Sequence, residues 1–427
     1  MVISTRRFRA LRSVADTVHC IPPWGIRASM TDERSRVVQE HEGVVVVGAG
    51  AAGHGCARAL SEAGFPGRIR VVNGEGGHPV NRTLVDTGIL PGLLTSEQIA
   101  LPPVADVEVI DGRAIRLRPK VRSVVLEDGR TIAGDAIVLA CGAVPRTLDR
   151  QIEVEHGVQQ HLLHGVDDAE RLRRALPEPA GTPIVVLGAG FIGAEVASHY
   201  AAAGARVTLI GRSPLPLRAA VGAVIASRLA VLHAERVDAR LGVGVSAIRT
   251  RDRRSNEGSG VVVELDDGTA VTGDVLVIAL GSRPAAAWAG FADAIPVDDR
   301  FRVQAHPGLY AAGSAAAPLL PWGRVRTDHW DAAAAQGAHA ARALLHDLGL
   351  ESDPGPWAPV QGFSLMVHGS VLAACGVFPP DAAEASVEFE GGGLVTEFRA
   401  GGVLNGVAGW NAGAHLVHAA ARLTRGG

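Results

Sequence analysis

The fold is decided by a stretch near the N-terminus that reads Gly43-Val44-Val45-Val46-Val47-Gly48-Ala49-Gly50-Ala51-Ala52-Gly53. Four consecutive valines predict a strand of a parallel sheet that is buried on both faces. Small residues and then a helical pattern follow, so the glycines have the G-x-G-x-x-G spacing between a strand and a helix. This arrangement predicts a turn that holds the pyrophosphate of a dinucleotide against the first turn of the helix.

The residues around this turn complete a nucleotide-binding unit. The next strand is expected at Ile69–Val72, and Glu75 follows it. An acidic residue about 20 residues after the glycines can accept hydrogen bonds from a ribose. We therefore expect the first unit to bind the adenosine half of a dinucleotide through Glu75.

The same unit occurs a second time, with Gly188 lying 140 residues after Gly48. The strand Pro183–Leu187 leads into Gly188-Ala189-Gly190-Phe191-Ile192-Gly193, a helix follows, and the second strand is expected at Arg206–Ile210. One glycine motif is weak evidence, because many turns need glycine. Two motifs in complete strand–turn–helix–strand contexts predict two dinucleotide-binding domains.

The second unit also indicates which nucleotide it prefers. A carboxylate after its second strand would hold the ribose of NAD and repel the additional phosphate of NADP. Gly211 and Arg212 stand there instead, and a guanidinium can pair with a 2′-phosphate in bidentate fashion. We favour NADPH over NADH, although a solvated surface arginine is the alternative.

Composition excludes several other classes of protein. Lys and Arg total 41 against 44 Asp and Glu, a net charge of −3, which gives no electrostatic basis for nucleic-acid binding and permits a homodimer. No uncharged apolar run reaches the ~18–20 residues that cross a bilayer, so we expect a soluble protein without a membrane partner. Cys20, Cys56, Cys141 and Cys375 are far apart, as in proteins of the reducing cytoplasm.

With both motifs in place, residues 43–427 resemble the FAD-dependent pyridine nucleotide-disulfide oxidoreductases, and most closely their ferredoxin/rubredoxin reductase-like branch. Six further segments carry this resemblance: Pro79–Arg82, Val138–Arg146 with Cys141 in the place of a threonine, Glu195, Val275–Pro284, Gly308–Gly313, and His329-Trp330 with Gln336-Gly337. In the family, Arg82 would lie beside the flavin, Glu195 on the nicotinamide side and the helix after His329 beside the flavin ring.

The resemblance implies an α/β fold with two Rossmann-like domains and a C-terminal α+β domain. The FAD domain would comprise residues 41–155 and 289–347, split by an inserted NAD(P) domain at 156–288, with a C-terminal interface domain at 350–427. In that domain we expect strands at 385–390 and 394–398 and a helix at 414–423. Residues 1–40 are expected to be a disordered extension, although a targeting peptide or an upstream start codon would fit the same basic stretch.

The motifs and the resemblance together nominate a set of cofactor-binding residues for FAD and for NADPH or NADH. They are Gly48, Gly50, Ala52, Gly53, Glu75, Arg82, Cys141, Gly142, Arg146, Gly188, Gly190, Ile192, Gly193, Glu195, Arg212, Gly281, Gly313, Ser314, His329 and Trp330. Because the chemistry would be centred on the flavin, Glu195 and Trp330 are expected only to position rings, and no residue is expected to act as a nucleophile.

Three departures from the family pattern lie around the expected flavin site. Thr87 stands where the family has a lysine, Ser314 where it has an aspartate, and Leu365-Met366 in a segment that normally carries a tryptophan and a glutamine. The implied activity is electron transfer from NADPH through the flavin to an iron–sulfur or similar carrier such as a ferredoxin or rubredoxin. The departures leave open a non-catalytic relative that binds cofactor poorly, and an NAD(P)H oxidase that uses oxygen is a third alternative.

The sequence lacks the residues that disulfide reduction, thiol peroxidase chemistry and metal binding would need. Disulfide reduction needs a cysteine pair beside the flavin, and a thiol peroxidase would need a cysteine near residues 75–85, where there is none. His156, His161 and His164 lie near one another in the sequence, but no cysteine or acid completes a metal-binding set. We therefore expect no metal site and interpret these histidines as solvated loop residues.

Overall fold

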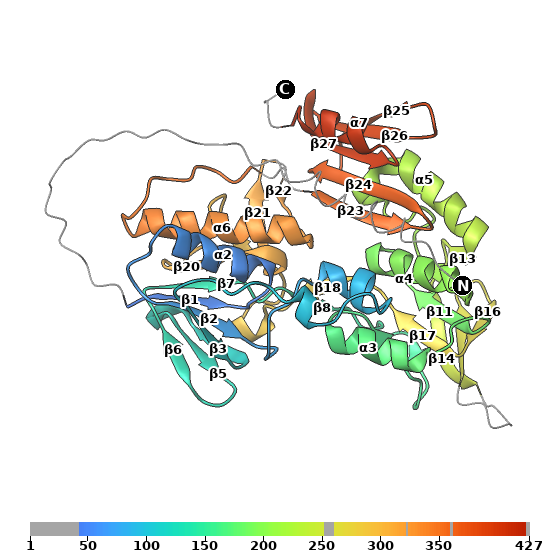
Figure 1. Ribbon diagram of the computed structural model, residues 1–427, viewed down its shortest axis with the longest axis horizontal. Coiled ribbons are helices and arrows are strands. Elements are labelled where there is room, and N and C mark those ends of the chain that lie inside the picture. The colour runs from blue at the N-terminus through green and yellow to red at the C-terminus, as the bar shows by residue number, and fades with distance from the viewer. Residues whose placement is uncertain (1–41, 252–259, 322, 359–361, 424–427) are drawn as a thin grey trace, which may run out of the picture. The chain divides into compact units, whose positions relative to one another are not determined.

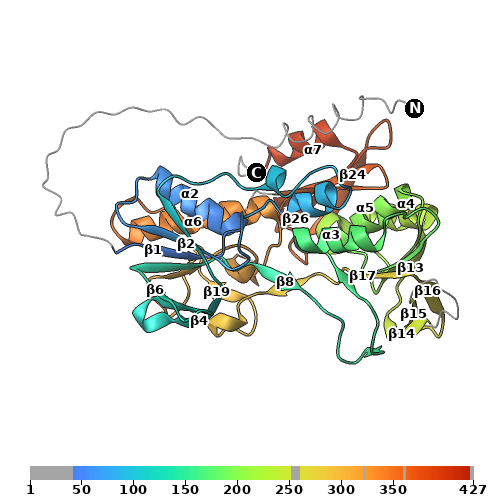
Figure 2. The same ribbon diagram turned by 60° about the horizontal axis from the view of Figure 1, so that its bottom comes forward.

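The computed structural model describes residues 42–251, 260–321, 323–358 and 362–423. The expected extension at 1–40 lies outside the described residues. Within these ranges the chain forms two parallel sheets of five strands each, one antiparallel sheet of five strands and several small sheets (Figures 1 and 2). No helix in the described ranges is both long and apolar enough to cross a membrane.

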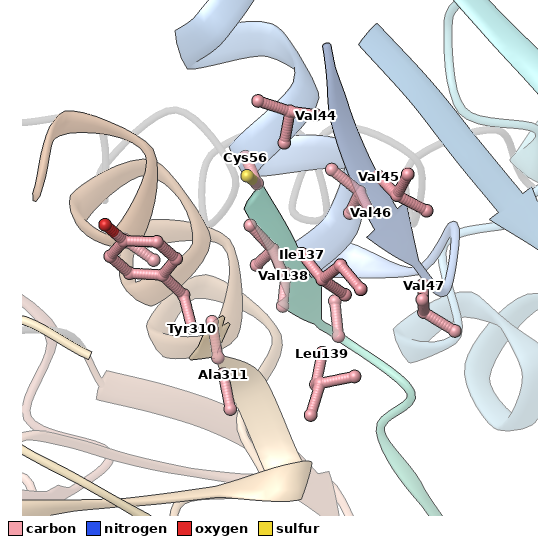
Figure 3. Close-up of a cluster of buried hydrophobic side chains, with 14 of the residues drawn as sticks. Val44, Val45, Val46, Val47, Cys56, Ile137, Val138, Leu139, Tyr310 and Ala311 are labelled. Carbon is pink, nitrogen blue, oxygen red and sulfur yellow. The ribbon is translucent and has the colours of Figure 1, made fainter. Parts of the chain in front are cut away.

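The first parallel sheet contains the valine run. Its strands, in spatial order, are β20 (Leu309–Ala311), β7 (Ala136–Leu139), β1 (Val44–Val47), β2 (Ile69–Asn73) and β3 (Val107–Asp111). All neighbouring pairs are parallel. Every residue of β1, β7 and β20 is buried, as the absence of polar alternation predicts. Figure 3 shows side chains from these three strands in one core, together with Cys56.

Two helices pack together in this part of the fold: α2 (Ala51–Glu62) and α6 (Trp330–Asp347), which lie side by side in both ribbon views. A Cβ on Gly55 would come within 2.3 Å of the Ala334 carbonyl oxygen, and one on Gly337 within 1.9 Å of the Ala52 oxygen. Only glycine allows the two backbones to approach this closely. Strand β20 and helix α6 follow all strands of the second parallel sheet in the sequence, so the first sheet contains strands from two separate segments of the chain.

The second parallel sheet has the order β10 (His161–Leu162), β17 (Val275–Ile278), β11 (Pro183–Leu187), β12 (Arg206–Gly211) and β13 (Asp238–Leu241). Helix α4 (Phe191–Ala202) follows β11, and α3 (Val166–Ala175) precedes it. The predicted strands at 183–187 and 206–210 are confirmed to within one residue.

Smaller sheets accompany the two parallel ones. One comprises β4 (Ala114–Arg118), β5 (Ser123–Leu126) and β6 (Thr131–Ala133); another comprises β9 (Glu153–Val154), β14 (Val245–Arg251), β15 (Gly260–Leu265) and β16 (Ala270–Gly273); a third comprises β19 (Ile295–Val297), β21 (Ala316–Leu320) and β22 (Gly323–Arg324). Short helical turns lie at Val85–Ile89 (η1), Glu97–Ile99, Pro119–Val121, Ala287–Ala289 and Gly313–Ala315. Strands β8 (Ala143–Pro145) and β18 (Ser282–Pro284) form a separate antiparallel pair.

The C-terminal sheet is entirely antiparallel. Its order is β23 (Gly362–Val367), β24 (Ser370–Gly376), β27 (Val403–Trp410), β26 (Leu394–Ala400) and β25 (Ala383–Glu388), and α7 (Gly413–Ala420) ends the described chain. Helix α5 (Arg218–Arg236) contributes Val221, Ile225 and Leu229 to the core of this sheet. The predicted fold class is confirmed: two parallel α/β units and a C-terminal α+β unit. The domain boundaries given above remain a prediction.

Candidate functional site

The first glycine turn leaves an open space at its centre. Gly48 has φ +114°, and a Cβ there would lie 2.2 Å from the Ala140 carbonyl oxygen. A Cβ on Gly53 would lie 1.7 Å from the Gly48 oxygen, so helix and strand could not pack with any other residue there. Gly50, by contrast, has no atom within 4 Å of its Cβ position. Outer glycines therefore close the turn, and the middle one leaves room for a ligand.

The second turn repeats this geometry closely. A Cβ on Gly188 (φ +107°) would lie 2.2 Å from the Ala279 oxygen, and one on Gly193 would lie 1.7 Å from the Gly188 oxygen. Gly190 again has nothing within 4 Å. Ile192 is half-buried and packs against the core of this unit, and its role in cofactor binding remains a prediction. Two independent stretches of sequence have thus folded into the same cradle.

Both cradles present helix N-termini that no side chain caps. Gly50 precedes α2 and Gly190 precedes α4, and neither helix has a capping side chain. The first N–H groups of a helix need an acceptor, and the helix dipole favours an anionic one. The phosphates of a dinucleotide supply such an acceptor, so these residues fit the two cofactors that the sequence predicts.

Gly313 brings the end of β20 to the first cradle. It has φ +72°, and its N–H donates to the buried Gln336 amide oxygen at 2.9 Å. A Cβ on Gly313 would lie 2.8 Å from the Ala52 Cβ, so Ala52 and Gly313 are neighbours, as expected of residues in one site. The Ser314 hydroxyl lies 3.5 Å from the Thr327 carbonyl oxygen, which is a weak contact. Ser314 therefore supplies a hydroxyl here without a charge.

The structure also joins three predicted residues at the β8–β18 pair. The Arg146 N–H donates to the Gly281 oxygen at 2.9 Å, and its Nε donates to the Ser282 oxygen at 2.8 Å. Gly142 and Gly281 both have positive φ and nothing within 4 Å. Nearby, Arg326 Nη1 is buried and has no partner among the described residues. This orphan guanidinium N–H is a donor that a bound group could use.

Glu75 and Arg82 are paired with each other. The Arg82 guanidinium contacts the Glu75 carboxylate with Nη2 and the His164 ring with Nη1. Burial, followed by the Arg82 charge, lowers the pKa of His164 to about 4, so this ring is neutral at pH 7. His164 lies in the loop between β10 and α3, as expected, but it is half-buried because tertiary packing brings it against Arg82. His161 is not in a loop, since it forms part of β10.

Three rings gather at the start of α4. Phe191 lies 4.8 Å from Phe363 and 5.3 Å from His329, both edge to face, and His329 stacks on Phe363 with centroids 4.7 Å apart. Phe363 belongs to β23, the segment that departs from the family pattern. Burial lowers the pKa of His329, so its ring is uncharged in this apolar cluster. Trp330, the first residue of α6, is half-buried.

Sequence reasoning missed one residue of the site, Asp86. It lies in η1 and is buried, and its carboxyl group affects the pKa of Glu195 of α4. Burial and the neighbouring carboxylate raise the pKa of Glu195 well above its ordinary value, and burial raises the pKa of Asp86. An isolated acid in the apolar stretch Leu84–Leu90 was the available signal. The neighbouring Thr87, which departs from the family pattern, is exposed, and its hydroxyl donates to the Thr83 carbonyl oxygen at 2.8 Å.

Neither thiol near the first cradle is activated. Burial raises the pKa of Cys56 to about 12 and that of Cys141 to about 11, so both are protonated at neutral pH. No cluster of metal-binding residues exists in the described part of the chain. Arg212 follows β12 and is exposed. Its assignment to a 2′-phosphate remains a prediction.

Comparison with known proteins agrees with this geometry. The model of the family described as "Pyridine nucleotide-disulphide oxidoreductase" matches residues 42–337, more than half of the chain. The chain is 31% identical to the ferredoxin reductase component of chlorobenzene dioxygenase from Cupriavidus sp. (strain PS12), over 77% of this chain and 80% of that one. It is 34% identical to the ferredoxin–NAD(+) reductase component of the anthranilate 1,2-dioxygenase system from Burkholderia cepacia, over 70% of this chain and 75% of that one.

Solved structures give the same result. The ferredoxin reductase for the CYP199A2 system from Rhodopseudomonas palustris superposes with a TM-score of 0.77 at 25% identity, covering 88% of this chain and 92% of that one. The sequence resemblance is thereby confirmed. The chain belongs to the pyridine nucleotide-disulphide oxidoreductase family, in the branch that contains the ferredoxin and rubredoxin reductases.

Proposed function

We propose that the protein is a FAD-dependent NAD(P)H oxidoreductase that passes electrons to a small iron–sulfur or similar carrier of the ferredoxin or rubredoxin type. The observation that carries this proposal is the duplicated cradle, in which Gly50 and Gly190 each leave open space before an uncapped helix. Two nucleotides can then bind in one chain, and a flavin converts a hydride donor into a source of single electrons. The relatives named above are reductases of such carriers.

The residues divide between the two cofactors as follows. The first cradle, with Gly48, Gly50, Ala52 and Gly53, would hold the FAD pyrophosphate, and Gly313 and Ser314 close that site from β20. Gly188, Gly190 and Gly193 would hold the pyridine nucleotide, and Arg212 would select NADPH by pairing with its 2′-phosphate. The protein contributes binding, orientation and exclusion of water.

Cysteine chemistry supports a reducing compartment. Cys56 and Cys141 are free thiols in the described part of the chain. Disulfides persist in oxidising compartments and are rare in the cytoplasm. We therefore place the protein in the cytoplasm, together with its carrier.

The test is NADPH oxidation by FAD-loaded protein, with and without an added ferredoxin-type carrier, while oxygen uptake is recorded. We expect the carrier to accelerate NADPH oxidation without a matching rise in oxygen uptake. Oxygen uptake that equals NADPH oxidation under both conditions would identify an oxidase. A protein that binds FAD poorly and oxidises no NADPH would support the non-catalytic alternative, to which Thr87 and Ser314 point.

A further inference from the structure

A cavity that belongs to neither glycine cradle lies at the C-terminal ends of α3 and α4. Its volume is about 530 Å³, which is within the range of small-molecule sites. Its lining comes from the residue after η1, from α3 and the loop that follows it, and from α4. His199, one of the lining residues, is nine residues after Gly190, or about 14 Å further along the helix. The cavity is therefore separate from the proposed nucleotide site.

One wall of the cavity is part of a buried core. Leu90 follows η1, Leu176 follows α3 and Tyr200 lies near the end of α4, and all three are buried in the same cluster as the apolar side chains of β11. Pro177 and Pro179 continue the lining from the loop after α3, and proline restricts the backbone there. This wall is preformed and largely apolar, so it suits the hydrocarbon part of a ligand.

Two arginines of α3 line the cavity without an acidic partner. In the described part of the chain neither Arg173 nor Arg174 forms an ion pair, whereas Arg171 of the same helix is paired with Asp168. The Arg173 guanidinium extends toward the turn after η1, where its Nη2 would lie 2.8 Å from a Cβ on Gly92. The cavity thus has positive charge at its edge that the protein itself does not neutralise.

α4 contributes two neutral polar side chains. Tyr200 is only 2% exposed, yet no described residue forms a hydrogen bond with its hydroxyl. Burial raises the pKa of Tyr200 to about 12, and the Arg173 charge acts in the opposite direction, so the guanidinium and the phenol are near each other. Burial lowers the pKa of His199, whose ring is therefore neutral at pH 7 and packs edge to face on Tyr200 at 4.8 Å. A buried hydroxyl without an acceptor is costly, and a ligand can supply that acceptor.

The charges around the cavity indicate which anion fits. Arg173 and Arg174 are positive and Glu170 is negative, while Arg174 Nε donates only to the Glu170 carbonyl oxygen, at 3.3 Å. Both arginines lie in the last turn of α3, where the helix dipole places partial negative charge. Compensation of that dipole needs no ligand, but it explains neither the cavity nor the Tyr200 hydroxyl. The positive charge that remains matches a monoanion and is too small for a dianion such as phosphate.

We propose that this cavity binds a small organic carboxylate, which carries one negative charge on an apolar body. The carboxylate accepts hydrogen bonds from Arg173, Arg174 and the Tyr200 hydroxyl, since guanidinium groups match the two carboxylate oxygens. The apolar body lies against Leu90 and Leu176. No covalent bond forms or breaks. This inference goes beyond the proposed function, because the site takes no part in hydride transfer.

The experiment is titration of the full-length, FAD-loaded protein with benzoate, followed by saturation-transfer NMR and calorimetry in a buffer without phosphate or carboxylates. Benzamide has the same ring without the charge, and inorganic phosphate has charge without the ring. We expect saturable binding of benzoate, competition by hexanoate, affinity for benzamide lower by about tenfold or more, and no displacement by an equal concentration of phosphate. Failure of both carboxylates to bind, equal affinity for benzamide, or displacement by phosphate would overturn the proposal.

Two variants and a matched control locate the binding. Arg173→Gln removes a charge and Tyr200→Phe removes only a hydroxyl, and each should weaken benzoate binding by about tenfold. Arg171→Gln is the control, because Arg171 is an exposed residue of the same helix that is already paired with Asp168, and it should bind benzoate as the unaltered protein does. Thermal midpoints check that all three are folded. Unchanged binding by Arg173→Gln, or equal weakening by Arg171→Gln, would refute the site.

A competition with pyridine nucleotide separates this inference from the proposed function. Benzoate should bind equally well in the presence of saturating NADP⁺ or NAD⁺, because the cavity lies apart from the second cradle. Displacement of benzoate by either nucleotide would place it in the cradle and refute the inference alone. A protein that binds benzoate in this way but does not oxidise NADPH or NADH would refute only the proposed function.

Discussion

Gly190 and Gly193 are separated by two residues and should respond to alanine in opposite ways. Gly190 has φ −83° and no atom within 4 Å of its Cβ position, so alanine fits the protein without ligand. A Cβ on Gly193 would lie 1.7 Å from the Gly188 oxygen, so alanine there must displace the backbone. We expect Gly190→Ala to weaken NADP⁺ binding by about tenfold or more, or about 1.4 kcal/mol, without lowering the thermal midpoint.

Gly193→Ala is the matched comparison. Overpacking of this severity costs about 1–3 kcal/mol or more, so this variant should unfold at a markedly lower temperature. Thermal denaturation and calorimetric titration of the two variants test the assignment. If Gly190→Ala binds nucleotide as tightly as the unaltered protein does, the open space is not the phosphate site.

Arg212 gives a second prediction at this scale. Charge-assisted hydrogen bonds contribute about 1.5–3 kcal/mol. We therefore expect Arg212→Ala to raise the KM for NADPH about ten- to a hundredfold and to leave the KM for NADH nearly unchanged. Arg240→Ala, which removes another exposed arginine close to β12, is the control. If the unaltered protein prefers NADH, the assignment of Arg212 to the 2′-phosphate of NADPH is refuted without any variant.

Sequence patterns predicted some residues of the candidate site and missed others. The role of each glycine follows from its spacing within one motif, and the geometry of both cradles agrees with that expectation. The effect of Asp86 on the pKa of Glu195 and the contact of Arg82 with His164 both relate residues far apart in the chain. Such contacts depend on how η1, α3 and α4 pack, and no local pattern encodes that packing.

Helix α5 is linked to the β23–β24 hairpin by a pair of histidines. His233 Nδ1 lies 3.1 Å from His368 Nε2, and His233 is fully buried. Burial, followed by the neighbouring histidine or arginine charge, lowers the pKa of each to about 4. Unfolded histidine titrates near 6.5, so below that pH the unfolded chain binds more protons than the folded one. The pair therefore stabilises the fold at neutral pH, and this stabilisation is lost as the pH falls from about 6.5 to about 4.

We predict that His233→Gln has a flatter dependence of unfolding free energy on pH in this window. The difference should not exceed about 3 kcal/mol, which is the value for one group shifted by about 2.5 units. Denaturant titrations at about pH 4.5, 5.5 and 6.5 measure the free energy of unfolding at each pH. His78→Gln replaces an exposed histidine and should follow the unaltered protein. Equal slopes in all three proteins would show that the histidine pair does not couple α5 to the hairpin.

Elements were predictable where their pattern is local. The valine-rich strands β1 and β11 lie within a residue of their expected ends, because continuous burial leaves a continuous apolar run. The C-terminal strands β25 and β26 were also expected, from their glycine-rich turn. The β8–β18 pair and η1 were not, since short strands and a single π-helical turn have no distinct sequence pattern and are stabilised by their surroundings.

At the scale of the whole molecule, the return of the chain to its first sheet decides the architecture. Strand β20 pairs with β7 although the complete second sheet lies between them in the sequence. Nothing in the composition of Leu309–Ala311 indicates this pairing, and the expectation came from the family resemblance. The duplicated cradles, by contrast, follow from sequence alone.

We propose that one chain holds a flavin and a pyridine nucleotide so that hydride passes directly between them. The most direct measurement is the visible absorbance spectrum of FAD-loaded protein before and after NADPH is added without oxygen. We predict an oxidised-flavin spectrum that bleaches within seconds of mixing, and whose colour returns when an oxidised ferredoxin-type carrier is added. A folded protein that stays colourless with FAD, or a bound flavin that NADPH does not bleach, would contradict the account.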